Sequence, residues 1–329
     1  MLAVLLALAS AVSYGGSDFA AGLASRKFSI ITITFLASIC SLLLTLAVLP
    51  WVASPAPSAA ALGWGAAAGL GGMSGALALY AGFRHAAFSV AGPLSAVSAA
   101  GLSVIVGILI GERPASMSLA GIGVALPAIV LVSLTAERPG PDQPAAAVPE
   151  LSPLASPGPA PPDAGPARHT SQVTRSAAGL LSRGAWPGVA TGLVAGVGFA
   201  LLFIGLDRAG QAAGLWPVLV SQTAEIVAIG GLLTWRTGLR SGSPGTGISP
   251  GTAWLAVLTG VSGGAGTIFY FLATHHGFLA ITAVLTSLYP AVTIALARVI
   301  ASERLSAARF AGLLLAGVSV TLIALGGTV

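Results

Sequence analysis

Long apolar stretches, interrupted by very few charged residues, are the feature that most constrains the fold of this chain. Only 7% of its 329 residues are charged, whereas a soluble domain carries about 25%. An α-helix needs about 20 apolar residues to cross a bilayer. We place ten such stretches at about residues 2–24, 29–51, 60–83, 88–111, 116–136, 185–206, 214–235, 252–274, 279–301 and 305–327. The sequence therefore predicts an all-α, polytopic, multi-pass protein of the cell membrane with ten transmembrane helices.

The remaining composition excludes several other classes of protein. A transmembrane β-strand has about 9–11 residues of alternating polarity, and these stretches do not alternate. The net charge of +5 does not indicate nucleic-acid binding, because the basic residues stand singly or in pairs at the ends of apolar stretches, where they orient helices. The single cysteine, Cys40, excludes an intrachain disulfide and a cysteine metal cluster. We expect the lipid bilayer as a partner, and no nucleic acid, metal or cofactor.

A proline-rich segment at residues 137–184 divides the chain into two halves. Its prolines include Pro157, Pro159, Pro161 and Pro162. Together with its charged residues, this composition disfavours both packing and membrane insertion. We predict a disordered linker here, with one five-helix unit at residues 1–136 and a second at residues 185–329.

The two halves repeat each other when one is shifted along the other by 191 positions, the distance from Glu112 to Glu303. The matches at this offset are Glu112-Arg113 with Glu303-Arg304, His85 with His276, Leu94 with Leu285, Ala120-Gly121 with Ala311-Gly312, and Gly69, Gly72 and Gly75 with Gly260, Gly263 and Gly266. A common register over three consecutive spans indicates a duplication. Because each half has five spans, the second half enters the membrane the opposite way up. The sequence thus predicts two inverted five-helix repeats related by a pseudo-two-fold axis in the membrane plane.

The end of each half resembles the EamA-type drug/metabolite transporters. An apolar helix, an acidic-basic pair and a last helix with glycine follow one another in Gly111-Glu112-Arg113 with Gly121, and in Ser302-Glu303-Arg304 with Gly312. The second half matches best, through Leu285-Thr286-Ser287-Leu288-Tyr289-Pro290 and then Glu303. The first half departs from this pattern, with Ala99 where Pro290 would be expected and Gly92-Pro93 earlier in the helix.

This resemblance implies a transporter fold, a small-molecule substrate of unspecified identity, and a central cavity lined by spans 1, 3, 4, 6, 8 and 9. We expect a secondary transporter that moves a small organic metabolite or drug-like solute by alternating access of the two repeats. Coupling to protons and uncoupled facilitation are both compatible with the sequence, as are import and export.

Two acidic residues lie inside the apolar stretches. Glu225 falls near the middle of the seventh span, and Asp18 lies about one and a half turns inside the first. A carboxylate at the centre of a transmembrane helix costs about 2.5–3.5 kcal/mol on insertion scales, and such residues usually face a cavity. We interpret both as candidates for proton coupling or for binding a substrate amine, with protonated packing residues as the alternative. Ser221 and Gln222 lie one turn before Glu225 on nearly the same face.

Hydroxyl groups recur at matching positions of the two halves. Ser95 and Ser98 are three residues apart on the fourth span, and the offset carries them to Thr286 and Tyr289 on the ninth. Each pair shares one helix face, and two faces that meet would offer hydrogen bonds to a solute near the middle of the membrane. The alternative is hydrogen bonding between helices, worth about 0.6 kcal/mol per bond. Two tyrosines add aromatic rings from neighbouring spans: Tyr14 and Tyr270.

Other motifs favour structural roles. The repeated glycines of the third and eighth spans favour close approach of helices, with a face that slides during transport as the alternative. Glu112-Arg113 and Glu303-Arg304 fall at helix ends, where an exposed ion pair and the start of the next helix explain them. His275 and His276 are adjacent and point in different directions on a helix, which favours interfacial anchoring over metal binding.

The sequence disfavours enzymatic activity, because no Ser-His-Asp, paired-carboxylate or His-Glu-x-x-His constellation is present. A membrane-embedded receptor or assembly subunit is the alternative to a transporter, and it predicts a close-packed interior without a cavity. Two indications of orientation conflict: the positive-inside rule places both termini outside, whereas the resemblance suggests that they lie inside.

Overall fold

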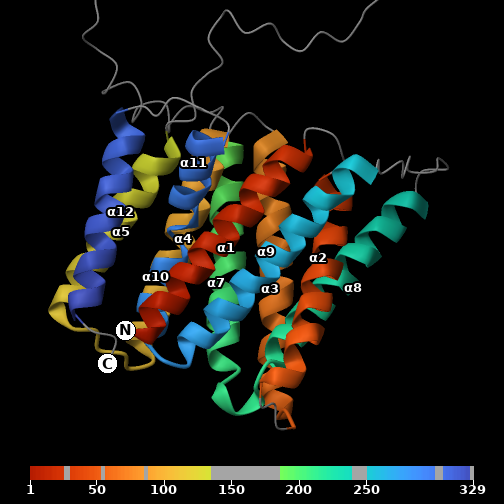
Figure 1. Cartoon of the computed structure of the whole chain (residues 1–329), viewed down its shortest axis with the longest axis horizontal. Helices are drawn as coiled ribbons and strands as arrows, with labels where there is room; N and C mark the ends of the chain where they lie inside the picture. Colours follow the sequence, from red (N-terminus) through yellow and green to blue (C-terminus); the bar gives the residue numbers. More distant parts are fainter. Residues whose placement is uncertain are drawn as a thin grey trace, which may run out of the picture.

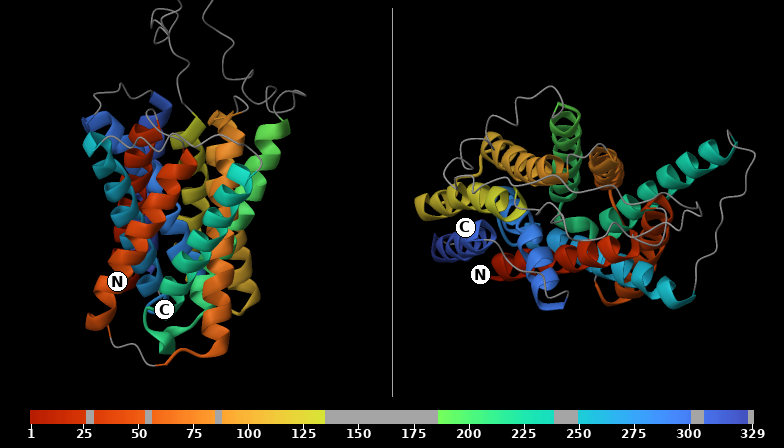
Figure 2. Two further views of the ribbon diagram at one scale, coloured as in Figure 1. Left: turned by 90° about the vertical axis from the view of Figure 1, so that its right-hand side faces the viewer. Right: turned by 90° about the horizontal axis from the view of Figure 1, so that it is seen from above.

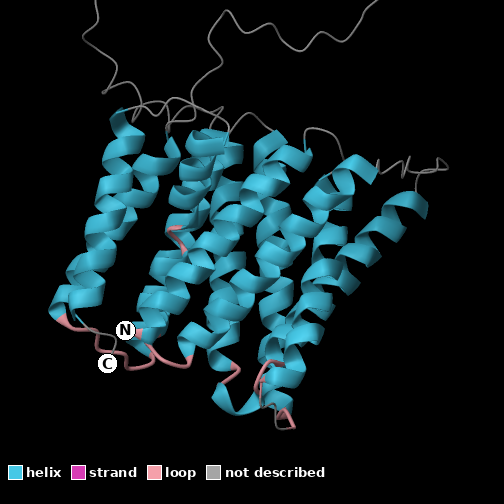
Figure 3. Ribbon diagram, in the orientation of Figure 1, coloured by secondary structure: helices cyan, strands magenta, loops and turns pink. Residues whose placement is uncertain are grey.

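The computed structural model describes residues 1–25, 30–52, 56–84, 88–134, 186–238, 250–300 and 307–326. These residues form a bundle of helices (Figure 1, Figure 3) without a strand among them. The first half contains α1 (Leu2–Ser25), α2 (Ile30–Val48), the 3-10 helix η1 (Leu49–Trp51), α3 (Ala59–Arg84), α4 (Phe88–Leu109) and α5 (Ser116–Leu134). The second half contains α7 (Trp186–Arg208), the 3-10 helix η2 (Gln211–Ala213), α8 (Trp216–Gly238), α9 (Pro250–Thr274), α10 (Leu279–Thr286), α11 (Tyr289–Ile300) and α12 (Ala307–Gly326).

The length and apolar character of these helices confirm an integral, multi-pass membrane protein. Within the described ranges, 9 helical segments are long and apolar enough to cross a membrane, and α10 with α11 is one of them. In α4 the apolar stretch is shorter, Leu94–Leu109. Glycine, proline and charged residues end the apolar stretches, so the helices begin and end within a few residues of the predicted positions. The predicted linker at residues 137–184 lies outside the described residues.

The ninth span is broken into two helices, where the sequence predicts one span over residues 279–301. α10 ends at Thr286 and α11 begins at Tyr289, with a turn between them. Pro290 has no backbone N–H to donate to the Thr286 carbonyl, and its ring clashes with a continuous helix. The matching position of the first half is Ala99, and α4 accordingly runs without a break.

The helices of the two halves are interleaved. α1 packs along α9, α3 along α7 and α8, α4 along α7, and α5 along α12, whereas consecutive helices of the same half contact each other less. Seen from above, α5 and α12 lie together at one end of the bundle (Figure 2). Each half therefore buries its helices mainly against the other half.

Two of the three repeated pairs of glycines lie at very close contacts between helices, as predicted, whereas Gly72 has only ordinary contacts with Leu202. Gly69 of α3 lies against the backbone of α8, and its copy in α9, Gly260, lies against α2. Gly75 of α3 lies against α7, and its copy Gly266 lies against α1. A side chain at any of these positions would press into the neighbouring helix, which is why small residues are favoured where membrane helices approach closely. Equivalent glycines thus contact equivalent helices of the opposite half.

The last helices of the two halves pair in the same way. Gly121 of α5 lies against Ile323 of α12, and its copy Gly312 of α12 lies against Val132 of α5. The Ser319 hydroxyl donates a hydrogen bond to the Gly121 carbonyl at 2.8 Å. The two last helices therefore pack through matching positions.

The first helices of the two halves run in opposite directions. In Figure 1, α1 rises from the face where the ends of the chain are marked, here called the lower face, and α7 descends toward it from the upper face. Opposite directions and matching contacts are what an inverted repeat predicts.

The close contact at Gly69 can be tested by adding one methyl group. Gly69→Ala places a Cβ where the Ser221 carbonyl of α8 lies, so α3 and α8 have to separate. We expect a loss of about 1–3 kcal/mol of stability, as for other overpacked interiors, measured as a lower thermal unfolding midpoint of the purified protein in detergent.

Gly123→Ala is the matched control, because a Cβ at Gly123 of α5 meets open space. Alanine is favoured over glycine inside a helix by about 0.5–1 kcal/mol, so this variant should be as stable as the wild type or slightly more stable. Equal midpoints for Gly69→Ala and Gly123→Ala would contradict the close contact between α3 and α8.

Candidate functional site

Tyr14 lies on a polar seam between α1 and α9. Its hydroxyl oxygen lies 2.9 Å from Oγ1 of Thr267, and its ring fits against Gly266. One turn away, the Ser17 hydroxyl donates to the Thr259 carbonyl at 2.9 Å. These contacts hold one face of α1 to α9 and fix the position of the Tyr14 ring.

Asp18 follows Tyr14 by one turn and lies on an open side of α1. Tyr14 faces α9, and Gly15 packs against Val292 of α11. Helical spacing therefore directs Asp18 between these two contacts. Asp18 is exposed, and Gly22, one turn further, has open space beside it. The carboxylate thus lies on an exposed side of α1.

Glu225 lies where α8 faces α2. The Ser38 hydroxyl of α2 lies near its carboxylate and donates to the Thr34 carbonyl of its own helix at 2.9 Å. Three residues earlier on α8, Gln222 donates from Nε2 to Oγ of Ser41 at 2.8 Å. Ser38 and Ser41 are also three residues apart, so both lie on the side of α2 that faces α8. Glu225 is half-buried and Gln222 is buried.

Both acids lie near Tyr14. Tyr14 lies within electrostatic range of both Asp18 and Glu225, so helices α1, α2, α8 and α9 surround these residues. Within the described part of the chain, no lysine or arginine forms an ion pair with either carboxylate. We call Tyr14, Asp18, Gln222 and Glu225 the central site.

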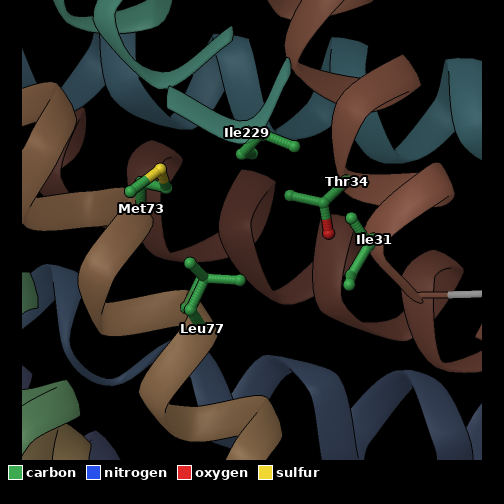
Figure 4. A pocket seen from close by; sticks show the side chains of 6 residues that line it. Ile31, Thr34, Met73, Leu77 and Ile229 are labelled. Atoms are coloured by element: carbon green, nitrogen blue, oxygen red, sulfur yellow. The ribbon is translucent and has the colours of Figure 1, made fainter. Parts of the chain in front are cut away.

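A small apolar hollow, with a cavity volume of about 10 Å³, lies beside the central site. It is lined by Ile31 and Thr34 of α2, Met73, Ala76 and Leu77 of α3, and Ile229 of α8. In Figure 4 the side chains of α3 face those of α2 across the hollow, with Ile229 at one side. Thr34 lies four residues before Ser38, and Ile229 lies four residues after Glu225. The hollow is therefore about one turn, roughly 6 Å, from the Glu225 position along the helix axis, toward the upper face.

A tightly packed hydrophobic cluster closes the lower face. Its buried members include Ala68, Phe203, Leu206, Leu215, Val218, Tyr270, Phe271 and Leu279. Tyr270 is fully buried, its hydroxyl donates to the Phe203 carbonyl at 3.1 Å, and the centroids of the two rings are 4.6 Å apart. Tyr270 therefore packs within the closed face in this structure, and its expected contact with a solute stays a prediction.

Glu112 joins the two halves of the chain at the lower face. Its carboxylate accepts hydrogen bonds from the backbone N–H groups of Leu279 and Ala280, the latter at 2.9 Å. Glu112 therefore caps α10 of the second half, whereas the sequence predicts a role at the start of the next helix, α5. Gly107 leaves room for the carboxylate, since a Cβ there would collide with it. The matching pair Glu303-Arg304 lies outside the described residues.

The helices that carry the paired hydroxyls pack against the first helix of the opposite half. Ser98 lies against α7, and its counterpart Tyr289 lies against α1. Ser95 donates to a carbonyl of its own helix at 2.8 Å, and the Thr286 hydroxyl is buried without a hydrogen-bond partner among the described residues. In this part of the chain no hydrogen bond joins one pair to the other. A solute held between the two pairs therefore stays a prediction.

Sequence reasoning missed Ser38, Ser41 and Thr267. Each is one small polar residue in an apolar span, and its sequence neighbours do not show which helix it faces. Ser38 and Ser41 carry a weak signal in the sequence. They are three residues apart and therefore share one face of α2, just as Gln222 and Glu225 share one face of α8.

The two adjacent histidines follow α9 at the lower face. His275 packs edge-on against Phe271 with ring centroids 4.4 Å apart, and His276 is exposed. Burial and the neighbouring His276 lower the pKa of His275 to about 4, so its ring is uncharged at neutral pH. No group of metal-binding side chains occurs among the described residues.

Comparison with known proteins identifies the class of this chain. The model of the EamA-like transporter family matches residues 1–134. A solved crystal structure shares the fold with a TM-score of 0.68 and 16% sequence identity, over 98% of this chain and 98% of that chain. No curated protein matches the chain. The family consists of transporters rather than enzymes, and the long apolar helices agree with it. Residues 1–134 therefore match the EamA-like transporter family.

Proposed function

We propose that this protein is a secondary transporter that moves a small organic solute by alternating access, with Asp18 and Glu225 lining the solute pathway. The observation that carries the proposal is an accessible pair of carboxylates beside an apolar hollow, above a closed lower face. A central site next to one closed face is the arrangement that alternating access needs in one of its two states.

The cap on α10 supports this proposal, because it joins the two halves at the closed face. Glu112 belongs to the first half, and the amides of Leu279 and Ala280 that it accepts from belong to the second. A carboxylate at a helix N-terminus is stabilised by the helix dipole as well as by the hydrogen bonds. Opening the lower face between the halves would break this contact, so the Glu112 cap stabilises the closed lower face.

Proton coupling is the finer part of the proposal and is assigned to Glu225 with Asp18. Both are acidic groups within membrane-spanning helices, and intramembrane acids commonly serve proton relays in transporters. Glu225 is half-buried and Asp18 is exposed, so a change between the two states of the transporter alters the surroundings of both. A receptor or assembly subunit would not need two accessible acids within its membrane spans.

Alternating access can be tested by labelling one cysteine in the hollow. Thr34→Cys in a Cys40→Ser background places a single thiol among the lining residues. In oriented vesicles we expect a membrane-impermeant thiol reagent to label it from the upper face. Adding Glu112→Ala should increase labelling from the lower face severalfold, because the cap on α10 is lost.

Two controls keep the labelling result interpretable. Cys40→Ser alone should take up no reagent, and Met117→Ala, at an exposed position of α5, should leave the labelling pattern unchanged. If the Glu112→Ala variant is folded and its labelling from the lower face stays at background, the Glu112 cap does not hold the lower face closed. Labelling from neither face would contradict a solute pathway through the hollow.

Coupling can be tested once a screen of metabolite efflux and toxic-analogue resistance, in cells with and without the protein, has supplied a transported solute. In proteoliposomes, Glu225→Gln should abolish uptake driven by a pH gradient, because glutamine cannot exchange a proton. Solute exchange without a gradient should persist in the variant and serves as its control. Uptake by Glu225→Gln that still follows the pH gradient would remove this residue from coupling.

A further inference from the structure

Three buried hydroxyl groups lack a hydrogen-bond partner among the described residues. They belong to Ser103 of α4, to Thr286 at the end of α10 and to Ser287 just after it, and none of these residues is more than 1% exposed. The other buried serines and threonines in the described ranges have partners. Ser133 of α5 also lacks one, but this residue is only half-buried. The fully buried exceptions are therefore confined to α4 and the end of α10.

α4 and α10 pack against each other across the two halves. A Cβ on Gly107 of α4 would lie 3.2 Å from the backbone nitrogen of Ala280 in α10. Ser103 precedes Gly107 by four residues and therefore lies on nearly the same face of α4. Because α4 descends toward the lower face (Figure 1), Ser103 lies one turn deeper in the bundle than the Gly107 contact. The unsatisfied hydroxyl of α4 thus lies on the side of the helix that meets α10.

The break in the ninth span adds a polar backbone group to the same region. Pro290 has no N–H to donate to the Thr286 carbonyl, and the unpartnered hydroxyls of Thr286 and Ser287 lie beside this carbonyl in the chain. A buried polar group without a partner costs free energy, which it regains when water or a polar solute reaches it. The closed lower face therefore buries these groups at a cost that opening would remove.

We infer that the lower face opens where α4 meets α10, and that Ser103, Thr286 and Ser287 line the solute pathway in the open state. This inference rests on the proposed function and identifies the lower half of the pathway. The Glu112 cap lies at the same contact, because it joins the turn after α4 to the first amides of α10. Loss of the cap and exposure of the hydroxyls therefore belong to one movement.

The contact between α4 and α7 has the opposite character. Gly196 of α7 lies directly against the backbone of α4 at Ser95 and Ala99, and the Ser95 hydroxyl donates to the carbonyl of Gly92 in its own helix. Separation at this point would lose close packing and would expose no unsatisfied hydroxyl. We therefore expect α4 to stay with α7 while α10 moves away from α4.

The three hydroxyls also define the chemistry of the opened path. A hydroxyl group donates one hydrogen bond and accepts others, and it carries no charge. Such groups replace water around a polar solute without selecting it by the sign of its charge. The lower half of the pathway is therefore suited to hydrogen-bonding solutes, and selection by charge is left to the acids of the central site.

The unsatisfied state of the Ser103 hydroxyl is tested with Ser103→Ala. Removal of a buried group without a partner should raise the thermal unfolding midpoint of the purified protein by about 2 °C or more. Ser319→Ala is the matched control and should lower the midpoint, because the buried Ser319 hydroxyl donates to the Gly121 carbonyl at 2.8 Å. A midpoint of Ser103→Ala that stays unchanged or falls would show that its hydroxyl is satisfied, for instance by a buried water, and would overturn the inference.

The place of opening is tested with Ser103→Cys in the Cys40→Ser background. A membrane-impermeant thiol reagent should label this thiol at background level from either face, and Glu112→Ala should increase labelling from the lower face severalfold. Gly107→Ala is a second way to open the same contact, because its Cβ would press against the Glu112 carboxylate. We expect it to increase the labelling in the same direction.

Ser319→Cys is the control for general loosening of the bundle. Ser319 is buried between α5 and α12, about two turns from the lower end of its helix, as Ser103 is in α4. Its thiol should stay at background with Glu112→Ala. Equal labelling of the two thiols would contradict an opening specific to α4 and α10.

Failure of this inference and failure of the transport proposal give different results. If the Thr34→Cys thiol gains labelling from the lower face with Glu112→Ala while the Ser103→Cys thiol stays at background, the lower face opens elsewhere. The inference is then wrong and alternating access stands. If neither thiol gains labelling from the lower face, both the inference and the role of the Glu112 cap in the proposed function are overturned.

Discussion

The need of each helix to satisfy its own backbone hydrogen bonds inside the bilayer is the constraint on which the rest of the structure depends. Such helices need few polar side chains to satisfy their backbone, and most of the chain is accordingly apolar. Many of the remaining polar groups bond a carbonyl of their own helix, as Thr259 does, and others bond across helices, as Tyr14 does with Thr267 and Gln222 with Ser41. Asp18 and Glu225 depart from this pattern, and they carry the proposed function.

The broken ninth span shows how the same constraint is met where a helix is interrupted. Interrupted backbone at membrane depth is tolerated when it is buried in protein. Every residue of α10 is buried, and its first amides are satisfied by Glu112 of the other half. The break therefore lies within the most enclosed part of the bundle, and the cap that closes the lower face also completes the hydrogen bonding of α10.

Much of this fold could be predicted from the sequence, because span length and apolar character depend on nearby residues only. The close helix contacts at the repeated glycines could also be predicted. At both Gly69 and Gly260 a neighbouring helix lies too close for a larger side chain. Contacts between distant helices could not. The cap from Glu112 to α10 and the pairing of Ser41 with Gln222 depend on which helices become neighbours, and no local pattern encodes that. Pro290 is the cause of the break in the ninth span and is visible in the sequence. The position of the break depends on the tertiary contacts of α10.

Interleaving of the two halves has a consequence for the biosynthesis of this protein. α1, α3 and α5 find their main neighbours in α9, α7 and α12, which are translated later. While the ribosome is still making the second half, the first helices reside in the lipid as separate spans with their glycine faces uncovered. Assembly of the bundle is therefore a late event, and a chain that ends after α5 has no core of its own to form.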